Sequence, residues 1–322
     1  MKTLLCLAYL SVALLHATDY NPGDTVSFWQ FDPVKGGEVF ENGYYQTDFV
    51  CRLKGEHSII FVEKELKPKS VPPAGFAEKL RDRFDWLYPT LSNYFGPPSD
   101  LDANGRFIIA VADIRDWFYY SMEVTAGMEP ILGIYWYPFN QKQKNDYLTM
   151  DSVQSDIEAY GTLAHEFFHN IYDSANPEPL KVPDRGVNEA LANYALYLNG
   201  TIDIDKYFQW QVSILKKDLE TGKLLDPFDG SHDYFDISNP DIHHCYAAGY
   251  HFVYYIANYI YDSPADRRDF FTRLIYEKPN ATSREKLLNA MLGLNIIASE
   301  AEYTKYYNEK FRYHLLQILD ID

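Results

Sequence analysis

The stretch "GTLAHEFFHN", residues 161–170, places two histidines four positions apart, with a glutamate directly after the first. On an α-helix, residues four apart lie one above the other on one face, so His165 and His169 can bind the same ion. Glu166 is rotated by about a third of a turn, so it misses the ion but can reach a water molecule beside it. The spacing therefore predicts a metal site; the alternative is that these are polar residues of a buried helix.

A catalytic zinc site usually has three protein ligands and one open position. After His169, a turn containing Pro, Asn and Gly leads into "VNEALANYALYL", residues 187–198, which has the character of a second helix. Its Glu189 lies 20 residues beyond His169, and the turn allows the two helices to pack together. The pattern predicts His165, His169 and Glu189 as ligands of Zn2+, with Glu166 as the general base of a metalloprotease.

The segments before the motif indicate strands, and those after it indicate helices. Residues 18–70 are predicted to be β-rich, because short aromatic or β-branched segments alternate there with turn residues. Residues 75–95 have helical spacing. The further predicted strands are "RFIIAVADI", "ILGIYWYPF" and "YLTMD". A helix is expected to begin near Ser152, with Val153 and Ile157 on its apolar face, and the rest of the chain is mostly helical. Strands followed by helices predict an α+β fold.

The N-terminus "MKTLLCLAYLSVALLHATDY" has one lysine, an apolar run and then Ala17. This pattern predicts that residues 1–17 are a signal peptide. The apolar run is too short to span a bilayer. No cysteine stands at the cleavage position, so no lipid anchor is expected, and no later stretch is apolar enough for a membrane span. The protein is expected to be secreted or periplasmic. The sequence leaves open whether Cys51 and Cys245 pair.

The formal net charge of −17, without any basic cluster, argues against nucleic acid or anionic membranes as partners. In "DLDANGRF", Asp100, Asp102 and Asn104 match the first half of an EF-hand loop. The position of the bidentate glutamate is occupied by Val111. A weak Ca2+ site is one interpretation, and an Asn-Gly turn leading into a strand is the other.

"HEFFH", followed 20 residues later by Asn188-Glu189, resembles the thermolysin-type zinc metallopeptidases, the gluzincins. Among them it is most similar to the hyicolysin-type bacterial peptidases. Other segments match that family in the same order along residues 50–260: "GEHSIIFVEKEL", "DANGRFIIAVADI", "YLTMDS" and "YAAGYHFVYYI". The resemblance implies a zincin-like domain over residues 71–322, with a small mixed sheet, an active-site helix and a mostly helical C-terminal part.

The chain departs from the family pattern around Glu189. Relatives usually have a Trp two positions before the Asn and a Gly after the Glu, whereas here Arg185-Gly186-Val187 precedes and Ala190 follows. Many relatives also carry a carboxylate that orients a zinc histidine, and Asn193 occupies that position. These departures concern the orientation of the ligands rather than their identity.

The resemblance also implies an oxyanion-stabilising tyrosine. In the aminopeptidase branch of the gluzincins this is the Tyr of a Tyr-x-x-Gly helix start, and "CYAAGYHF" places Tyr246 in that position. A phenol O–H is a suitable donor to a developing oxyanion. Alternatively, Tyr246 packs with Tyr250 and Tyr254 on one helix face, and His243 or His244 is the donor.

The resulting prediction is a secreted zinc endopeptidase that cleaves protein or peptide substrates. "GIYWYP", residues 133–138, lies where relatives have an exposed edge strand that can pair with an extended peptide; the alternative is an ordinary aromatic strand. A zinc aminopeptidase is a second interpretation, because "AGMEP", residues 126–130, partly matches the Gly-x-Met-Glu-Asn exopeptidase motif. A third is an exported adhesion or binding protein with a structural zinc, against which the free Glu166 argues.

Overall fold

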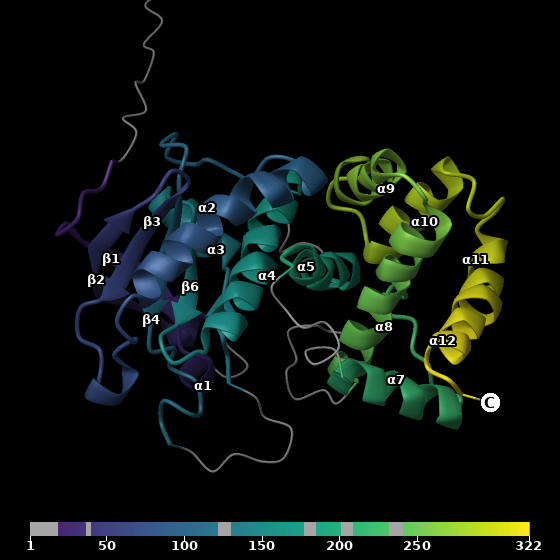
Figure 1. The fold of residues 1–322 in the computed structure, drawn as a ribbon, viewed down its shortest axis with the longest axis horizontal. Coiled ribbons are helices and arrows are strands. Elements are labelled where there is room, and N and C mark those ends of the chain that lie inside the picture. The colour runs from purple at the N-terminus through teal and green to yellow at the C-terminus, as the bar shows by residue number, and fades with distance from the viewer. Residues whose placement is uncertain are drawn as a thin grey trace, which may run out of the picture.

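A computed structural model of the chain describes residues 19–36, 40–121, 130–176, 185–200, 209–231 and 241–321. Figure 1 shows a β-sheet at one end of the molecule and the C-terminal helices at the other, with α4 and α5 between them. The predicted α+β class is confirmed. The predicted signal peptide and most of the "AGMEP" stretch lie outside the described residues. Within the described ranges, no helix is both long and apolar enough to cross a membrane.

The strands form one mixed sheet of six strands in the order β1-β2-β3-β4-β6-β5. Their bounds are β1 Thr25–Phe31, β2 Tyr44–Lys54, β3 Ser58–Glu63, β4 Phe107–Ala112, β5 Gly133–Ile134 and β6 Tyr147–Asp151. The first three strands are antiparallel, whereas β3, β4 and β6 run parallel. The short β5 pairs antiparallel with β6 and forms the outer edge of the sheet.

One strand prediction is wrong in its extent. "ILGIYWYPF" is a strand only at Gly133–Ile134, and a helix, α3 (Tyr137–Gln143), begins three residues later. Pro138 explains the change, because proline has no backbone N–H to donate to a neighbouring strand but fits the first turn of a helix. The edge strand is therefore much shorter than "GIYWYP" suggested.

Helices cover one face of the sheet, and aromatic residues of the N-terminal strands line the other. On the first face, Phe84 of α2 (Phe76–Phe95) and Phe167 of α4 (Asp156–Ala175) have ring centroids 4.8 Å apart. On the second face, Phe28 packs on Phe61 with centroids 5.2 Å apart. Every residue of β3 and β4 is buried as a result, so the strands next to the helices are the most apolar of the sheet.

The helix that carries the histidines begins later than predicted. Ser155 caps α4: its side chain accepts from the N–H of Glu158, and the Glu158 carboxylate accepts from the N–H of Ser155 at 2.9 Å. This capping box fixes the first turn. Val153 therefore precedes the helix, and both Val153 and Ile157 are exposed, so their assignment to its apolar face is wrong.

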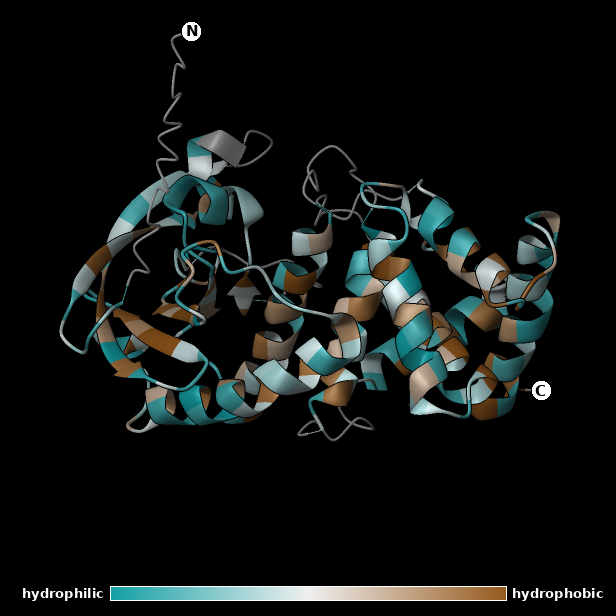
Figure 2. Ribbon diagram, turned by 90° about the horizontal axis from the view of Figure 1, so that it is seen from above, coloured by the Kyte–Doolittle hydropathy of each residue, from teal (hydrophilic) through white to brown (hydrophobic). Residues whose placement is uncertain are grey.

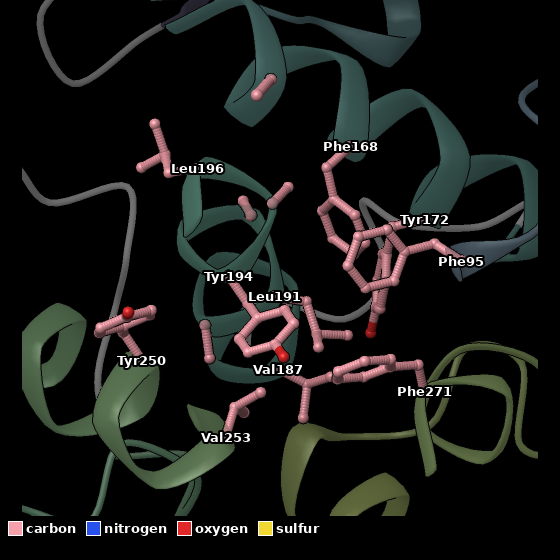
Figure 3. Packing of buried hydrophobic residues seen from close by; sticks show 14 of the residues in the cluster. Phe95, Phe168, Tyr172, Val187, Leu191, Tyr194, Leu196, Tyr250, Val253 and Phe271 are labelled. Carbon is pink, nitrogen blue, oxygen red and sulfur yellow. The ribbon is translucent and has the colours of Figure 1, made fainter. Parts of the chain in front are cut away.

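The remaining helices form the C-terminal part of the molecule. Their bounds are α5 Gly186–Leu198, α7 Gln209–Thr221, α8 Ile242–Tyr255, α9 Pro264–Tyr276, α10 Ser283–Gly293, α11 Ala301–Lys305 and α12 Arg312–Ile318, and a short helix, α1 (Pro33–Gly36), follows β1. In Figure 2 these helices carry hydrophilic and hydrophobic patches side by side, as amphipathic helices do. Figure 3 shows how Phe168, Leu191, Val253 and Phe271 pack where α4, α5, α8 and α9 meet.

Candidate metal centre

The structure brings together the three residues predicted as ligands. Nε2 of His165 lies 3.3 Å from Oε2 of Glu189, and Nε2 of His169 lies 3.6 Å from the same oxygen. One ligand atom from each residue lies within 4.8 Å of the other two. Helix α4 supplies the histidines and α5 the glutamate, as the spacing of 20 residues predicted. Such an arrangement can hold a metal ion.

The position of Glu189 depends on a close approach at the start of α5. A Cβ atom on Gly186 would lie 2.3 Å from the carbonyl oxygen of Pro227, so only glycine fits there. The next residue, Val187, donates its N–H to Oγ of Ser283 at 2.8 Å. Glu189 is therefore held in the first turn of a helix whose start is fixed against the C-terminal part.

The donor set fits zinc. Oε2 of Glu189 is buried, and among the described residues no well-directed hydrogen bond reaches it, which leaves a charged oxygen to be satisfied by an ion. Two imidazoles and one carboxylate form a ligand set of catalytic zinc sites. Burial lowers the pKa of His169, so its imidazole is neutral, as a ligand must be. Burial alone would raise the pKa of Glu189, but the neighbouring His169, His165 and Arg185 outweigh it and keep this carboxylate ionised.

Glu166 lies beside these ligands and is held by the edge of the sheet. Its Oε2 accepts a hydrogen bond of 2.8 Å from the backbone N–H of Tyr135, just after β5. Burial raises the pKa of Glu166. Glu166 is not part of the candidate ligand group of His165, His169 and Glu189. A carboxylate in this place can exchange a proton with a water molecule or a substrate in front of it.

One of the two candidate ligand histidines is oriented by Asn188, the neighbour of Glu189 in the Asn-Glu pair. Nδ1 of His169 lies 2.9 Å from Oδ1 of Asn188. Because an amide oxygen only accepts, Nδ1 carries the hydrogen, and the lone pair of Nε2 faces Glu189. Asn193, which occupies the position of a carboxylate in many relatives, makes no hydrogen bond to either histidine within the described part of the chain.

Tyr246 belongs to this site. It lies near the start of α8, and the pKa of its hydroxyl is raised by burial first and then by the negative charge of Glu189. The phenol is therefore protonated and can donate. The other members of the alternative helix face pack elsewhere: Tyr250 is buried in the core, and Tyr254 contacts the ring of Tyr197 at 5.1 Å.

The two histidines considered as alternative donors have other neighbours. Nδ1 of His244 lies 2.8 Å from both carboxylate oxygens of Asp218 on α7. His243 contacts the ring of Trp210 edge-on at 5.6 Å. Of the three candidates for stabilising an oxyanion, Tyr246 is thus the one with a described interaction with a ligand residue.

Two buried charged residues near the ligands were missed by the sequence analysis. Arg185 precedes α5, and its Nε lies 3.5 Å from Oε1 of Glu189. Asp173 lies one turn beyond His169 on α4 and is 2% exposed. The available signal was sequence spacing: Asp173 stands four positions after His169 on α4, and Arg185, the residue before α5, stands four positions before Glu189.

The predicted calcium ligands are only partly together. Asp100 and Asp102 form an acidic group with Asp146, which the sequence analysis did not include. The amide of Asn104 donates to Oδ2 of Asp102 at 2.6 Å, and its oxygen accepts from the N–H of Arg106, so it is not turned toward this group as a ligand. Burial raises the pKa of Asp102 to about 7.

The remaining cysteines do not form a disulfide. Cys51 and Cys245 are both buried free thiols. Cys51 packs in the cluster on the far face of the sheet, whereas Cys245 packs against Ile242 on α8. Neither belongs to the ligand group.

The α+β fold thus places two histidines and a glutamate from two helices where they can hold a metal ion. A comparison with curated proteins finds the "Neutral metalloprotease ShpI" of Staphylococcus hyicus, with 31% identity over 142 residues. The match covers 39% of this chain and 32% of that protein, so the chain spans about a third of its relative. The predicted resemblance to metallopeptidases is confirmed by this similarity, and zinc as the cofactor is supported by the donor set.

Comparisons with solved structures find an M1 zinc metallopeptidase from Deinococcus radiodurans and its E323A mutant. For the mutant, the TM-score is 0.44 and the identity 15%, with 89% of this chain and 61% of that chain covered. For the unmutated protein, the TM-score is 0.44 and the identity 14%, with 90% and 62% covered. No family model matches the chain.

Proposed function

We propose that this protein is a zinc metallopeptidase whose peptidase domain comprises residues 71–322. The observation that supports it most is the convergence of His165, His169 and Glu189, with Glu166 held beside them by the N–H of Tyr135. Similarity to a metalloprotease over part of the chain agrees with it. A site that served only structure would need no free carboxylate next to three ligands.

His165, His169 and Glu189 would hold zinc, which would supply a Lewis acid for the scissile carbonyl and for water. Glu166 takes the proton from the attacking water, since it lies beside the ligands without being one of them. Its raised pKa, caused by burial, favours holding that proton until it passes to the leaving amine. The protonated hydroxyl of Tyr246 donates to the developing oxyanion. The N–H of Tyr135 keeps Glu166 directed toward the reacting groups.

We further propose endopeptidase activity on peptides bound beside β5. This strand pairs only with β6 in the described sheet, so its outer edge has backbone groups for an extended peptide. The alternative is an aminopeptidase, which needs a carboxylate to hold the substrate amine; its candidate, Glu129, lies outside the described residues. The third interpretation, an adhesion protein with a structural zinc, requires that Glu166 has no catalytic role.

The decisive experiment combines metal analysis with two kinds of substrate. Wild type and Glu166→Gln are assayed for zinc content and for cleavage of casein and of amino-acid anilides. We expect one zinc per chain in both proteins and cleavage of casein by wild type alone. Preference for the anilides would favour the aminopeptidase. Bound zinc with no hydrolysis of either substrate by wild type would favour the binding protein.

The proposal also covers export and a calcium site. Export by cleavage after residue 17 predicts that the mature protein begins at Thr18, which N-terminal sequencing of the secreted protein would test. A weak Ca2+ site is proposed at Asp100 and Asp102. The third ligand is a carboxylate oxygen of Asp146 rather than the amide oxygen of Asn104. Calcium takes oxygen ligands of this kind.

A further inference from the structure

The two helices that carry the metal ligands also carry one buried charge each. Asp173 lies one turn beyond His169 on α4, and Arg185 stands directly before α5, one turn before Glu189. The Asp173 side chain is almost fully buried, and the Arg185 side chain is 13% exposed. Burying either charge is costly unless an opposite charge compensates it, so the two residues are expected to act together.

The two carboxylate oxygens of Glu189 face different neighbours. Oε2 lies 3.3 Å from Nε2 of His165 and 3.6 Å from Nε2 of His169. Oε1 lies 3.5 Å from Nε of Arg185. The guanidinium therefore occupies one oxygen and leaves the other for an ion.

We propose that Arg185 is a positioning residue of the metal site, which holds Oε1 of Glu189 so that Oε2 is the single oxygen offered to the metal. This inference rests on the proposed zinc function.

The surroundings of Glu189 support this role. Glu189 and Asp173 are both buried carboxylates, 6% and 2% exposed, and a buried carboxylate is costly unless positive charge lies close to it. Arg185 supplies such a charge to Glu189, because its Nε lies 3.5 Å from Oε1.

Lysine should replace Arg185 only in part. A guanidinium has several N–H donors in a fixed plane and can contact two carboxylates at once, whereas an ammonium is a compact charge on a flexible chain. Arg185→Lys keeps the charge and loses the geometry. Arg185→Met keeps much of the volume and loses both.

The experiment measures metal binding rather than catalysis. Apo forms of wild type, Arg185→Lys, Arg185→Met and Asp173→Asn are titrated with zinc against a chromophoric chelator, and their cobalt forms are compared by visible absorption, which reports the coordination of the ion. Arg284→Met is the matched control, because Arg284 also pairs with a carboxylate, Asp226 at 3.0 Å, but outside the metal site. Thermal unfolding of each apo protein shows whether it is folded.

We expect Arg185→Met to weaken zinc binding by about 10-fold to 100-fold, the range found when residues that orient metal ligands are replaced. Arg185→Lys should lie between it and wild type, Asp173→Asn should weaken binding less than Arg185→Met, and Arg284→Met should bind as wild type does. The cobalt spectrum of Arg185→Met should change, because Oε1 of Glu189 becomes free to approach the ion.

Wild-type zinc affinity together with a wild-type cobalt spectrum in folded Arg185→Met would overturn the inference. If that variant does not fold, Arg185→Lys decides in the same way, and a wild-type affinity and spectrum there count against a need for the guanidinium geometry. Failure of wild type itself to bind zinc would instead refute the proposed function, so the two failures are distinguishable.

Discussion

The backbone N–H of Tyr135 donates a hydrogen bond of 2.8 Å to Oε2 of Glu166, which joins the edge of the sheet to the helix of the metal site. The approach is close because Gly133 faces α4: a Cβ atom there would lie 2.3 Å from Cγ2 of Thr162 and 2.9 Å from Cγ of Glu166. The edge strand thus positions the proposed general base and borders the proposed substrate cleft at the same time.

Gly133→Ala should therefore reduce peptidase activity while leaving the metal bound. The added methyl group must push β5 away from α4, which lengthens the hydrogen bond from Tyr135 and frees Glu166 to rotate. We expect a loss of at least ~10-fold in kcat, in line with the sensitivity of general bases to their position. Steady-state kinetics on a peptide substrate and zinc analysis of the same samples measure the two quantities.

A second substitution controls for general damage. Thr162→Ser removes Cγ2, the atom nearest to the added methyl group, so Gly133→Ala/Thr162→Ser should recover part of the activity. The single variant Thr162→Ser should behave as wild type. Full activity of Gly133→Ala would show that the contact does not position Glu166.

Removal of a ligand should act on the metal first. His169→Ala and Glu189→Ala should each weaken zinc retention by at least ~10-fold, because even residues that only orient ligands have effects of that size. Cys51→Ser/Cys245→Ser is the control, since both thiols lie outside the ligand group and should not affect zinc. Dialysis against a chelator followed by zinc analysis compares the variants. Equal zinc content in all of them would contradict the assignment of His169 and Glu189.

The parts of this site that lie within a helical turn could be predicted from the sequence. The spacing of His165, Glu166 and His169 is a local property, so the periodicity of one helix places them. Predicting Glu189 as a ligand also required the assumption that two consecutive helices pack together. The turn residues between the two helical segments support that assumption. The Tyr246 assignment came from resemblance alone, because nothing local links α8 to α4.

The parts that depend on contacts across the fold could not be predicted. Tyr135 acts through its backbone N–H, which has no sequence signature, and the register of β5 against β6 decides where it lies. The spacing of Asp173 and Arg185 from the ligands shows neither the burial of Asp173 nor the contact of Arg185 with Glu189, which the fold creates. The long strand predicted for "ILGIYWYPF" was wrong because apolar alternation outweighed the helix-starting preference of Pro138.

The acidic group formed by Asp100, Asp102 and Asp146 makes a prediction for pH dependence. Burial, together with the charges of Asp146 and Asp100, raises the pKa of Asp102 to about 7 from an ordinary value of 3.8. Between these values the folded protein keeps a proton that the unfolded chain has lost. The contribution of Asp102 to stability is therefore present at low pH and falls as the pH rises to about 7.

Asp102→Asn should remove this dependence. Without divalent cations at pH 8, we expect the variant to be more stable than wild type by about 1 kcal/mol, after allowance for solvent screening of the Asp102 carboxyl group.

Calcium bound at the acidic group should raise the midpoint of thermal unfolding of wild type and have less effect on Asp102→Asn. Unfolding curves at pH 5 and pH 8, with calcium and with a chelator, measure both effects. An equal response of the two proteins to calcium would exclude a site at Asp102.

The last prediction separates endopeptidase from aminopeptidase activity. An exopeptidase must hold the free amine of its substrate with a negative group at a closed end of the cleft. The sequence offers Glu129 for this, but Pro130 follows it, which cannot donate an N–H and restricts Glu129 to extended conformations. An internal peptide segment bound along β5 needs no amine contact. Acetylation of a test peptide should therefore leave its cleavage largely intact.

Two substitutions make this test specific. Glu129→Gln should have little effect on the cleavage of either peptide, because an endopeptidase does not use that carboxylate. Glu166→Gln should lower the rate on both by at least ~10²-fold, because the general base is lost in either mechanism. Mass spectrometry of the products identifies the bonds that are cut. If acetylation abolishes turnover and free peptides lose single residues in order from the N-terminus, the protein is an aminopeptidase, and Glu129→Gln should then impair it.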